Sequence, residues 1–234
     1  MQKVSIILPS KDEEGTIGLV LDDLIKVTDN LKSDYNFELI VINDCSKDRT
    51  AEIAAGFKDV MLYSTDKPLG KGNALNLGFQ KSSGEIIIMM DSDCSHRAAE
   101  IPLFLEKIQE GADLVIGSRF FGGSDEYSPI RHFGNTFLTF CFNFLFQKYI
   151  KDVLNGYKAF RRELIDNFKY VSRSYEIEIE LLANAAESNM LICEIPSYER
   201  RRAAGKEKSR IIIHGFKFLT MIIKRGIKFR KFIK

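Results

Sequence analysis

The sequence predicts an α/β fold, with one doubly wound and mostly parallel sheet flanked by helices. Short, almost wholly apolar runs alternate along the chain with segments whose apolar residues recur at helical spacing. The runs show no polar face, which is typical of strands that helices cover on both sides. A length of 234 residues suits one core of this kind. The content of 45% hydrophobic and 28% charged residues is that of a globular protein.

The elements follow from the same pattern, taken along the chain. Strands are predicted in the apolar runs 4–8, 38–42, 60–63, 86–90 and 114–116. Helices are predicted between them from three apolar stripes: Ile17, Val20, Leu21, Leu24 and Ile25; then Leu75 and Phe79; then Ile101, Leu105 and Ile108. In sheets of this kind ligands bind outside the carboxyl ends of the strands, so the loops after the strands are where a site is expected.

Four of these loops are unusually polar. They read PSKDEEG after the first run, NDCSKDRT after the second, DSDCSH after the fourth and GSRFFGG after the fifth. Asp91 and Asp93 stand at the end of an apolar run, where an unpaired charge is costly, so we expect them to bind a cation just beyond the strand. Mg²⁺ and Mn²⁺ favour oxygen ligands and complete their shells with water and substrate phosphates. The loops therefore predict a site for a metal-bound phosphate.

The segment KPLGKGNALNLGF adds a cationic entrance to a helix. Lys67 and Lys71 stand with two glycines immediately before the helical stripe, at a position that favours an anion. The segment is not a P-loop, because G-x-x-x-x-G-K-[ST] is absent. No G-x-G-x-x-G follows the first strand either, which weakens the case for a dinucleotide-dependent oxidoreductase.

The C-terminal segment is basic and amphipathic. The net charge is only +2, yet from Lys208 onward there are nine Lys and Arg and no acid, interspersed with Ile, Phe and Met. This pattern is typical of helices on an anionic membrane surface, and it lacks the stacking platform expected for nucleic acid. The aromatic segment 133–149 is too short and polar to cross a bilayer, which needs about 20 apolar residues. We expect it to be a second interfacial helix, with packing in the core as the alternative.

Cysteine usage and the first residues predict an intracellular protein. The four cysteines are scattered without a C-x-x-C pair, which favours a reduced compartment over a disulfide scaffold or a zinc site. The start, MQKVSIILPS, lacks the features of a signal peptide and is expected to be the first strand.

Seven segments in order resemble one family. They are IILPSKDEEGTIG, VINDCSKDRT, GKGNALNLGF, MMDSDCSH, IGSRF, DVLNGYKAFRRE and EIPSYERRRAAGKEKS. The chain resembles family 2 glycosyltransferases of GT-A fold, and within them the polyprenyl-phosphate glycosyltransferases typified by dolichyl-phosphate mannose synthase. The resemblance implies one Rossmann-like sheet and a GT-A catalytic domain over residues 1–209. Residues 210–234 are then a basic amphipathic helix that binds a membrane surface or a partner.

The resemblance also implies residue roles. Donor binding falls to Pro9, Glu13, Asp44, Lys71, Ser92, Arg131 and Lys208. The catalytic set is Asp91, Asp93, Arg119 and Arg202, in which the aspartates hold Mg²⁺ or Mn²⁺ and the arginines clamp phosphates. The glutamine that commonly follows the Asp-x-Asp pair in the family is Ser95 here, so either His96 or water completes the metal shell. The late signature of the family keeps Lys208 but has Glu207 in place of serine.

The implied reaction is the inverting transfer of a hexose from a nucleotide sugar to a polyprenyl (dolichyl) monophosphate. The donor is expected to be of the GDP-mannose or UDP-glucose class, and the enzyme peripheral on the cytoplasmic face of a membrane, with a homo-oligomer or a membrane subunit left open. An ionised phosphate acceptor needs no protein base, since its second pKa is about 6. A hydroxyl acceptor needs one, with Asp125, Glu126 and Asp152 as candidates.

Two other classes stay open beside a hydroxyl acceptor. A non-catalytic nucleotide-sugar-binding protein could keep the same fold. A haloacid-dehalogenase-like phosphatase also uses Asp-x-Asp, but its pair usually follows the first strand, which here ends in LPSKDEE.

Overall fold

The computed structural model describes residues 1–126, 128–204 and 211–232. The strands are β1 (Gln2–Ser10), β2 (Tyr35–Asn43), β3 (Val60–Ser64), β4 (Ile86–Met89), β5 (Leu114–Ser118), β6 (Lys158–Arg161) and β7 (Ile192–Pro196). The helices are α1 (Ile17–Leu31), α2 (Thr50–Ala55), α3 (Lys71–Lys81), α4 (Ile101–Gln109), α5 (Arg119–Gly122), α6 (Pro129–Phe146), α7 (Glu163–Asp166), α8 (Ile177–Glu187) and α9 (Ile211–Phe232). A 3₁₀ turn, η1 (Ala98–Glu100), precedes α4.

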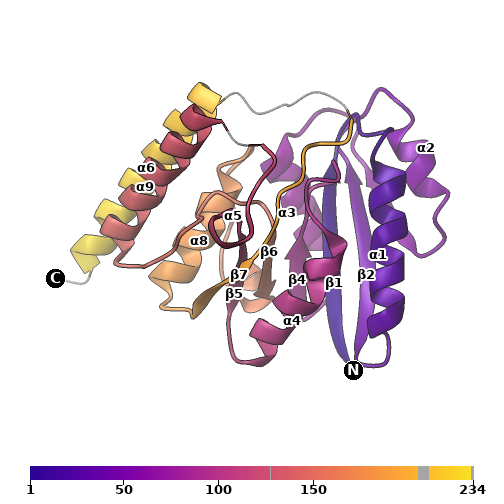
Figure 1. Cartoon of the computed structure of the whole chain (residues 1–234), viewed down its shortest axis with the longest axis horizontal. Helices are drawn as coiled ribbons and strands as arrows, with labels where there is room; N and C mark the ends of the chain where they lie inside the picture. Colours follow the sequence, from indigo (N-terminus) through magenta and orange to yellow (C-terminus); the bar gives the residue numbers. More distant parts are fainter. Residues whose placement is uncertain (127, 205–210, 233–234) are drawn as a thin grey trace.

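The strands form one mixed, mostly parallel sheet in the order β3-β2-β1-β4-β6-β5-β7 (Figure 1). Only β6 runs antiparallel to its neighbours, β4 and β5. The predicted fold class is therefore confirmed, and all five predicted strands are present. The two further strands, β6 and β7, were not predicted from the sequence.

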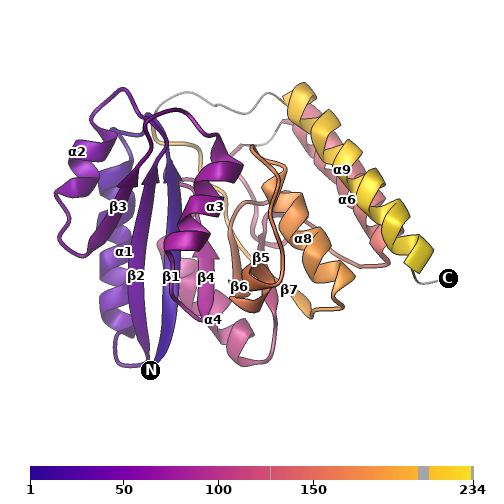
Figure 2. The ribbon, with the colours of Figure 1, turned by 180° about the vertical axis from the view of Figure 1, so that it is seen from behind.

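Helices cover both faces of the sheet. On one face α1 and α4 share a core cluster with Val4, Ile6 and Leu8 of β1, and on the other α3 and α8 share one with Ile7 of β1 and Ile40 of β2 (Figures 1 and 2). Alternate residues of β1 thus enter opposite cores, which is why the strand reads as continuously apolar. The carboxyl ends of the parallel strands meet along the upper edge in Figure 1.

α6 and α9 lie side by side at the β7 end of the molecule (Figures 1 and 2). They cross closely, because a Cβ at Gly226 of α9 would lie only 2.5 Å from Leu145 Cβ of α6. Phe146 stacks on Phe229 with ring centroids 5.5 Å apart. Part of the aromatic segment is thus core, since Phe142 and Phe146 are buried. No helix in the described part of the chain has both the length and the apolar character needed to cross a membrane.

Candidate active site

A pocket of about 630 Å³ opens at the carboxyl ends of the parallel strands, between the sheet, α3, α6, α8 and α9. The predicted site residues that line it are Pro9, Glu13, Asp44, Lys71, Asp91, Ser92, Asp93, His96, Arg119, Arg131 and Arg202. The structure thus brings together every predicted site residue except Lys208, which lies outside the described residues. The roles assigned to these residues stay predictions.

The Asp-x-Asp loop turns sharply back toward the sheet. Cys94 takes a left-handed conformation with φ of 66°, so that the backbone N–H of Ser95 donates to Asp93 Oδ1 at 2.9 Å and its hydroxyl donates to the same oxygen at 2.5 Å. Ser92 donates its hydroxyl to the carbonyl of Pro9 at 3.1 Å and joins this loop to the first. Ser95, at the position of the family's glutamine, therefore orients Asp93.

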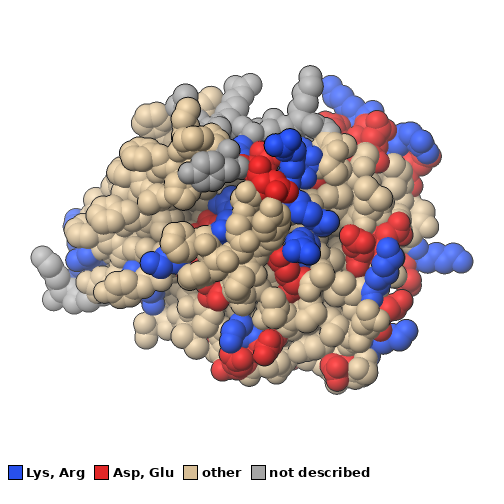
Figure 3. All heavy atoms as spheres, viewed as in Figure 1, with Lys and Arg blue, Asp and Glu red and all other residues tan. Residues whose placement is uncertain are grey.

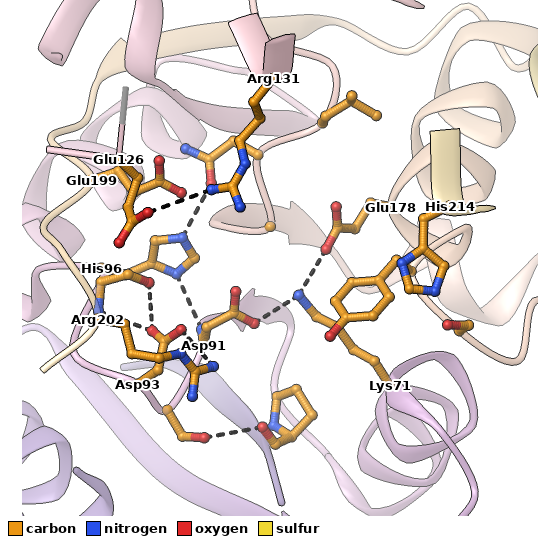
Figure 4. Close-up of a pocket in the computed structure, with 18 of the residues that line it drawn as sticks. Lys71, Asp91, Asp93, His96, Glu126, Arg131, Glu178, Glu199, Arg202 and His214 are labelled. Atoms are coloured by element: carbon orange, nitrogen blue, oxygen red, sulfur yellow. Dashed lines mark hydrogen bonds and ion pairs between the residues drawn. The ribbon is translucent and has the colours of Figure 1, made fainter. Parts of the chain in front are cut away.

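Lys71 lies between two carboxylates (Figure 4). Its Nζ is 2.7 Å from Asp91 Oδ1 and 2.7 Å from Glu178 Oε1. Burial lowers the pKa of Lys71, but Asp91 and Glu178 outweigh burial and hold it above its usual value. Burial likewise opposes ionisation of Asp91, whose pKa nevertheless falls to about 2 because of Lys71 and other nearby cations. Lys71 and Asp91 are thus charged at neutral pH.

Arg202 connects the Asp-x-Asp loop to the first loop. Its guanidinium lies 3.0 Å from Asp93 Oδ2 and 2.8 Å from Glu13 Oε1. Glu13 is buried and also accepts a hydrogen bond from the hydroxyl of Thr16 at 3.1 Å. Glu13 therefore holds an arginine in the pocket.

Asp44 shapes the entrance to α3. Its carboxylate accepts hydrogen bonds from the backbone N–H groups of Leu69 and of Gly70, the latter at 3.0 Å. Gly70 has φ of +86°, a conformation that favours glycine. Asp44 thus fixes the turn that positions Lys71 in the pocket.

Arg119 is paired with two carboxylates, those of Asp152 and Glu199. Its guanidinium donates to both oxygens of Asp152, from Nε at 2.7 Å and from Nη2 at 2.8 Å, and lies 3.2 Å from Glu199. Burial raises the pKa of Asp152, but Arg119 outweighs it and holds that pKa below its usual value. Asp152 is therefore a weak base. Arg131 lies 3.7 Å from Glu126.

His96 is buried beneath the loop. Its Nδ1 accepts the backbone N–H of Asp91 at 3.1 Å, which places the ring proton on Nε2, 3.2 Å from Asn155 Oδ1. The ring also stacks on Tyr157 with centroids 4.8 Å apart. Both ring nitrogens are engaged with the protein, so a metal-ligand role for His96 requires the ring to move.

Sequence reasoning missed several polar residues that line the pocket, among them Asn155, Glu178 and His214. Glu178 carried a recognisable signal. α8 reads IEIELLANAAE, and a carboxylate buried in a helix with so many apolar side chains needs a cationic partner. His214, whose ring centroid is 4.7 Å from that of Tyr175, comes from α9. The C-terminal helix thus forms part of the pocket wall.

The carboxylate oxygens of Asp91 and Asp93 suit a divalent cation that the protein contacts on one side only. Asp91 and Asp93 present oxygen ligands to a pocket large enough for further ligands. Within the described ranges, no three His, Cys, Asp or Glu side chains gather around one point where a metal could sit. Asp91 and Asp93 would therefore hold a cation here, with water or substrate oxygens as its remaining ligands.

A mostly parallel sheet with two carboxylates and several basic side chains at its carboxyl edge is the arrangement of GT-A-fold glycosyltransferases. The family model described as Glycosyl transferase family 2 matches residues 5–168. The chain belongs to glycosyltransferase family 2.

The similar proteins agree with that family. A dolichol-phosphate mannosyltransferase from Pyrococcus furiosus is 30% identical over 213 residues, which are 88% of this chain but only 59% of the relative. A dolichyl-phosphate hexose transferase from Haloferax volcanii is 28% identical over 200 residues, covering 86% of this chain and 84% of the relative. A solved glucosyl-3-phosphoglycerate synthase from Mycobacterium tuberculosis, in complex with Mn²⁺, UDP and phosphoglyceric acid, has a TM-score of 0.73 at 22% identity, covering 97% and 78% of the two chains.

Proposed function

We propose that this chain is a metal-dependent inverting hexosyltransferase that moves a hexose from a nucleotide sugar, of the GDP-mannose or UDP-glucose class, to a polyprenyl monophosphate. The observation that carries the proposal is the single pocket in which Asp91 and Asp93 face Lys71, Arg119 and Arg202. Relatives named as dolichyl-phosphate mannosyl and hexose transferases support the choice of acceptor.

The charged residues would bind the diphosphate of the donor and stabilise it as the leaving group. Mg²⁺ or Mn²⁺, held by Asp91 and Asp93, would neutralise the negative charge that develops on the leaving nucleoside diphosphate. Lys71 and Arg202 lie next to these aspartates. They would donate hydrogen bonds to oxygens of that diphosphate. Pro9, Glu13 and Asp44, from the loops after β1 and β2, also line the pocket, and the nucleoside would lie against them.

The acceptor is proposed to bind near Arg119 and Arg131, because guanidinium groups suit phosphate. A phosphate oxygen attacks the anomeric carbon and the carbon–oxygen bond to the nucleoside diphosphate breaks, with inversion. No base is needed if the phosphate is ionised. Asp152 is a poor base for a hydroxyl acceptor, since both its oxygens accept from Arg119. Its pairing therefore favours a phosphate acceptor.

The pocket is further proposed to work at the cytoplasmic face of a membrane, with residues 1–209 as the catalytic domain and residues 210–234 as a membrane-surface helix. Phe133 and Phe140 of α6 are 74% and 64% exposed, and Phe216 of α9 is 68% exposed. The surface over α6 is largely uncharged (Figure 3). Exposed Lys224 and Lys228 of α9 would add about 1 kcal/mol each on an anionic surface.

The experiment is the transfer of radiolabel to lipid. Purified protein is incubated with Mn²⁺ or Mg²⁺, a panel of GDP- and UDP-sugars and a polyprenyl monophosphate, and then extracted with organic solvent. We expect label in the lipid phase with one donor, lost on chelation of the metal and in Asp91→Ala and Asp93→Ala. A matched control is Asp23→Ala, an exposed aspartate of α1.

Two other results would each assign a different function. Nucleotide binding without lipid label, but with label on a sugar or small molecule, would move the acceptor to a hydroxyl. Binding without transfer to any acceptor would favour a non-catalytic nucleotide-sugar-binding protein.

A further inference from the structure

Glu178 reaches the pocket from α8, a helix otherwise packed into the core. It is only 4% exposed. Its Oε1 lies 2.7 Å from Lys71 Nζ, the same distance that separates this nitrogen from Asp91 Oδ1. One buried ammonium is thus shared by a proposed metal ligand and a carboxylate with no assigned role (Figure 4).

The backbone of Gly156 lies directly against this group of three charges. A Cβ at residue 156 would lie 3.0 Å from Glu178 Oε1, 3.1 Å from Lys71 Nζ and 3.4 Å from Asp91 Oδ2. These contacts are tight for the first two atoms and ordinary for the third. The glycine therefore allows the three groups to pack in contact with one another.

Lys71 is confined from the other side as well. A Cβ at Gly72 would lie 2.4 Å from the carbonyl oxygen of Ser172, so the segment before α8 runs directly over the start of α3. The ring of Tyr175 lies 5.3 Å from Lys71 Nζ, within the range of a cation–π contact. With its backbone held in this way, the ammonium can move mainly between its two carboxylates.

In this arrangement Lys71 and a divalent cation compete for the carboxylate of Asp91. A divalent cation that binds Asp91 draws this carboxylate away from the ammonium, which then needs another anionic partner because its side chain is only 11% exposed. Glu178, the second residue of α8, provides that partner at a helix N-terminus, where a carboxylate is favoured. Without it, Lys71 would have Asp91 as its only acidic partner in the group.

We infer that Glu178 is a positioning residue that holds Lys71 while Asp91 takes up the divalent cation, and so sets the metal affinity of the Asp-x-Asp pair. The inference rests on the proposed metal-dependent function. Glu178 also keeps Lys71 close to the metal, where a diphosphate oxygen would lie.

The test is Mn²⁺ binding, followed by the EPR signal of free Mn²⁺, with protein alone and with UDP or GDP. We expect Glu178→Gln to bind Mn²⁺ about tenfold more weakly, as is common when a residue behind a metal ligand is changed. Lys71→Met should bind Mn²⁺ more tightly than the wild type in the absence of nucleotide. In the Lys71→Met background, Glu178→Gln should have a much smaller effect, because no ammonium is left to hold.

Two further variants keep the result interpretable. Glu178→Asp retains the charge but withdraws the carboxylate from Lys71, and we expect it to weaken Mn²⁺ binding in the same direction. Glu176→Gln is the matched control, since it removes the same charge from the start of the same helix, where Glu176 pairs with Lys217 at 3.3 Å. It should bind Mn²⁺ as the wild type does. Thermal unfolding checks that each variant is folded.

Three outcomes overturn the inference. Wild-type affinity in Glu178→Gln does so directly, and an equal loss in both backgrounds shows that Lys71 is not the link. A wild-type protein that binds no Mn²⁺ overturns this role together with the metal-dependent reaction. Mn²⁺ binding that follows the expected order, without transfer to lipid phosphate, supports the role of Glu178 while removing only the proposed acceptor.

Discussion

At the scale of single residues, the site is a set of cations already paired with carboxylates. Lys71 pairs with Asp91 and Arg202 with Asp93, while Arg119 is bound by Asp152. Buried charges require such partners, because removing them from water without compensation is costly. A metal-bound diphosphate would replace carboxylates with phosphates around the same cations. The site is thereby kept charged and ordered in its protein-only form.

His96 gives a prediction at this scale. His96→Phe keeps a ring to stack on Tyr157 but removes the acceptor for Asp91 N–H and the contact with Asn155. We expect a loss of about 1–3 kcal/mol in the free energy of unfolding, the cost of leaving buried polar groups unpaired. Urea denaturation in the presence of chelator measures it.

Tyr157→Phe is the matched control for that variant. It removes only the hydroxyl that donates to the carbonyl of Arg97 at 3.1 Å, so its loss should be smaller. Unchanged stability of His96→Phe together with loss of Mn²⁺ binding would instead make His96 a metal ligand.

Some of these residues could be identified from sequence and others could not. Asp91, Asp93 and Arg119 follow apolar runs, and a parallel sheet brings such ends to one edge. Asn155 gives no such signal, and although the apolar context of Glu178 indicates that it needs a cationic partner, no local pattern identifies that partner as Lys71, 107 residues away. Pairing between distant elements depends on how the helices pack, which one sequence does not specify.

At the scale of elements, the start of α3 is positioned by close backbone contact. The glycines at 70 and 72 flank Lys71, and both would clash with the carbonyls of residues 172–174 if they carried a Cβ. Two segments a hundred residues apart can thus touch without side chains between them, which places α3 and α8 on either side of the pocket.

Gly72→Ala tests this contact. Helix propensity alone predicts stabilisation of up to about 1 kcal/mol, because alanine is a better helix former. We expect destabilisation by about 1–3 kcal/mol instead, since the new Cβ would lie 2.4 Å from Ser172 O, which is backbone and cannot move easily. Thermal unfolding shows whether the variant is less or more stable than the wild type.

Gly134→Ala on α6 is the control for that substitution. Nothing lies within 4 Å of the new Cβ, so propensity should decide and the variant should be slightly more stable than the wild type. A stabilised Gly72→Ala would mean that the segment before α8 gives way, and that Lys71 is held less tightly than the contacts indicate.

The same scale explains which elements the sequence could predict. The five predicted strands read as continuous apolar runs, whereas β6 reads KAFR, with Lys158 fully buried. Burial lowers the pKa of Lys158 to about 8. A strand that carries a buried lysine has no apolar pattern to identify it. Its antiparallel pairing with β4 and β5 could not be predicted for the same reason.

At the scale of the whole molecule, the two ends differ in surface character. In Figure 3 the end with α1 and α2 is densely charged, while the surface over α6 is largely uncharged. Large exposed apolar patches on a protein mark sites of interaction with proteins or membranes. Because α6 and α9 also line the pocket through Leu138 and Phe218, a membrane on this surface would lie next to the proposed acceptor site.

Vesicle binding tests this surface. Phe133→Ser combined with Phe140→Ser should weaken co-sedimentation with anionic vesicles about tenfold or more at low salt, because burial of one Phe contributes about 1.5–3 kcal/mol. Leu19→Ser is the matched control, an exposed apolar residue of α1, 57% exposed at the other end of the molecule, and should sediment like the wild type. Equal loss in the control would indicate nonspecific adsorption, and wild-type sedimentation of the double variant would contradict a membrane role for α6. A change in oligomeric mass without any change in sedimentation would assign the same surface to another copy of the chain.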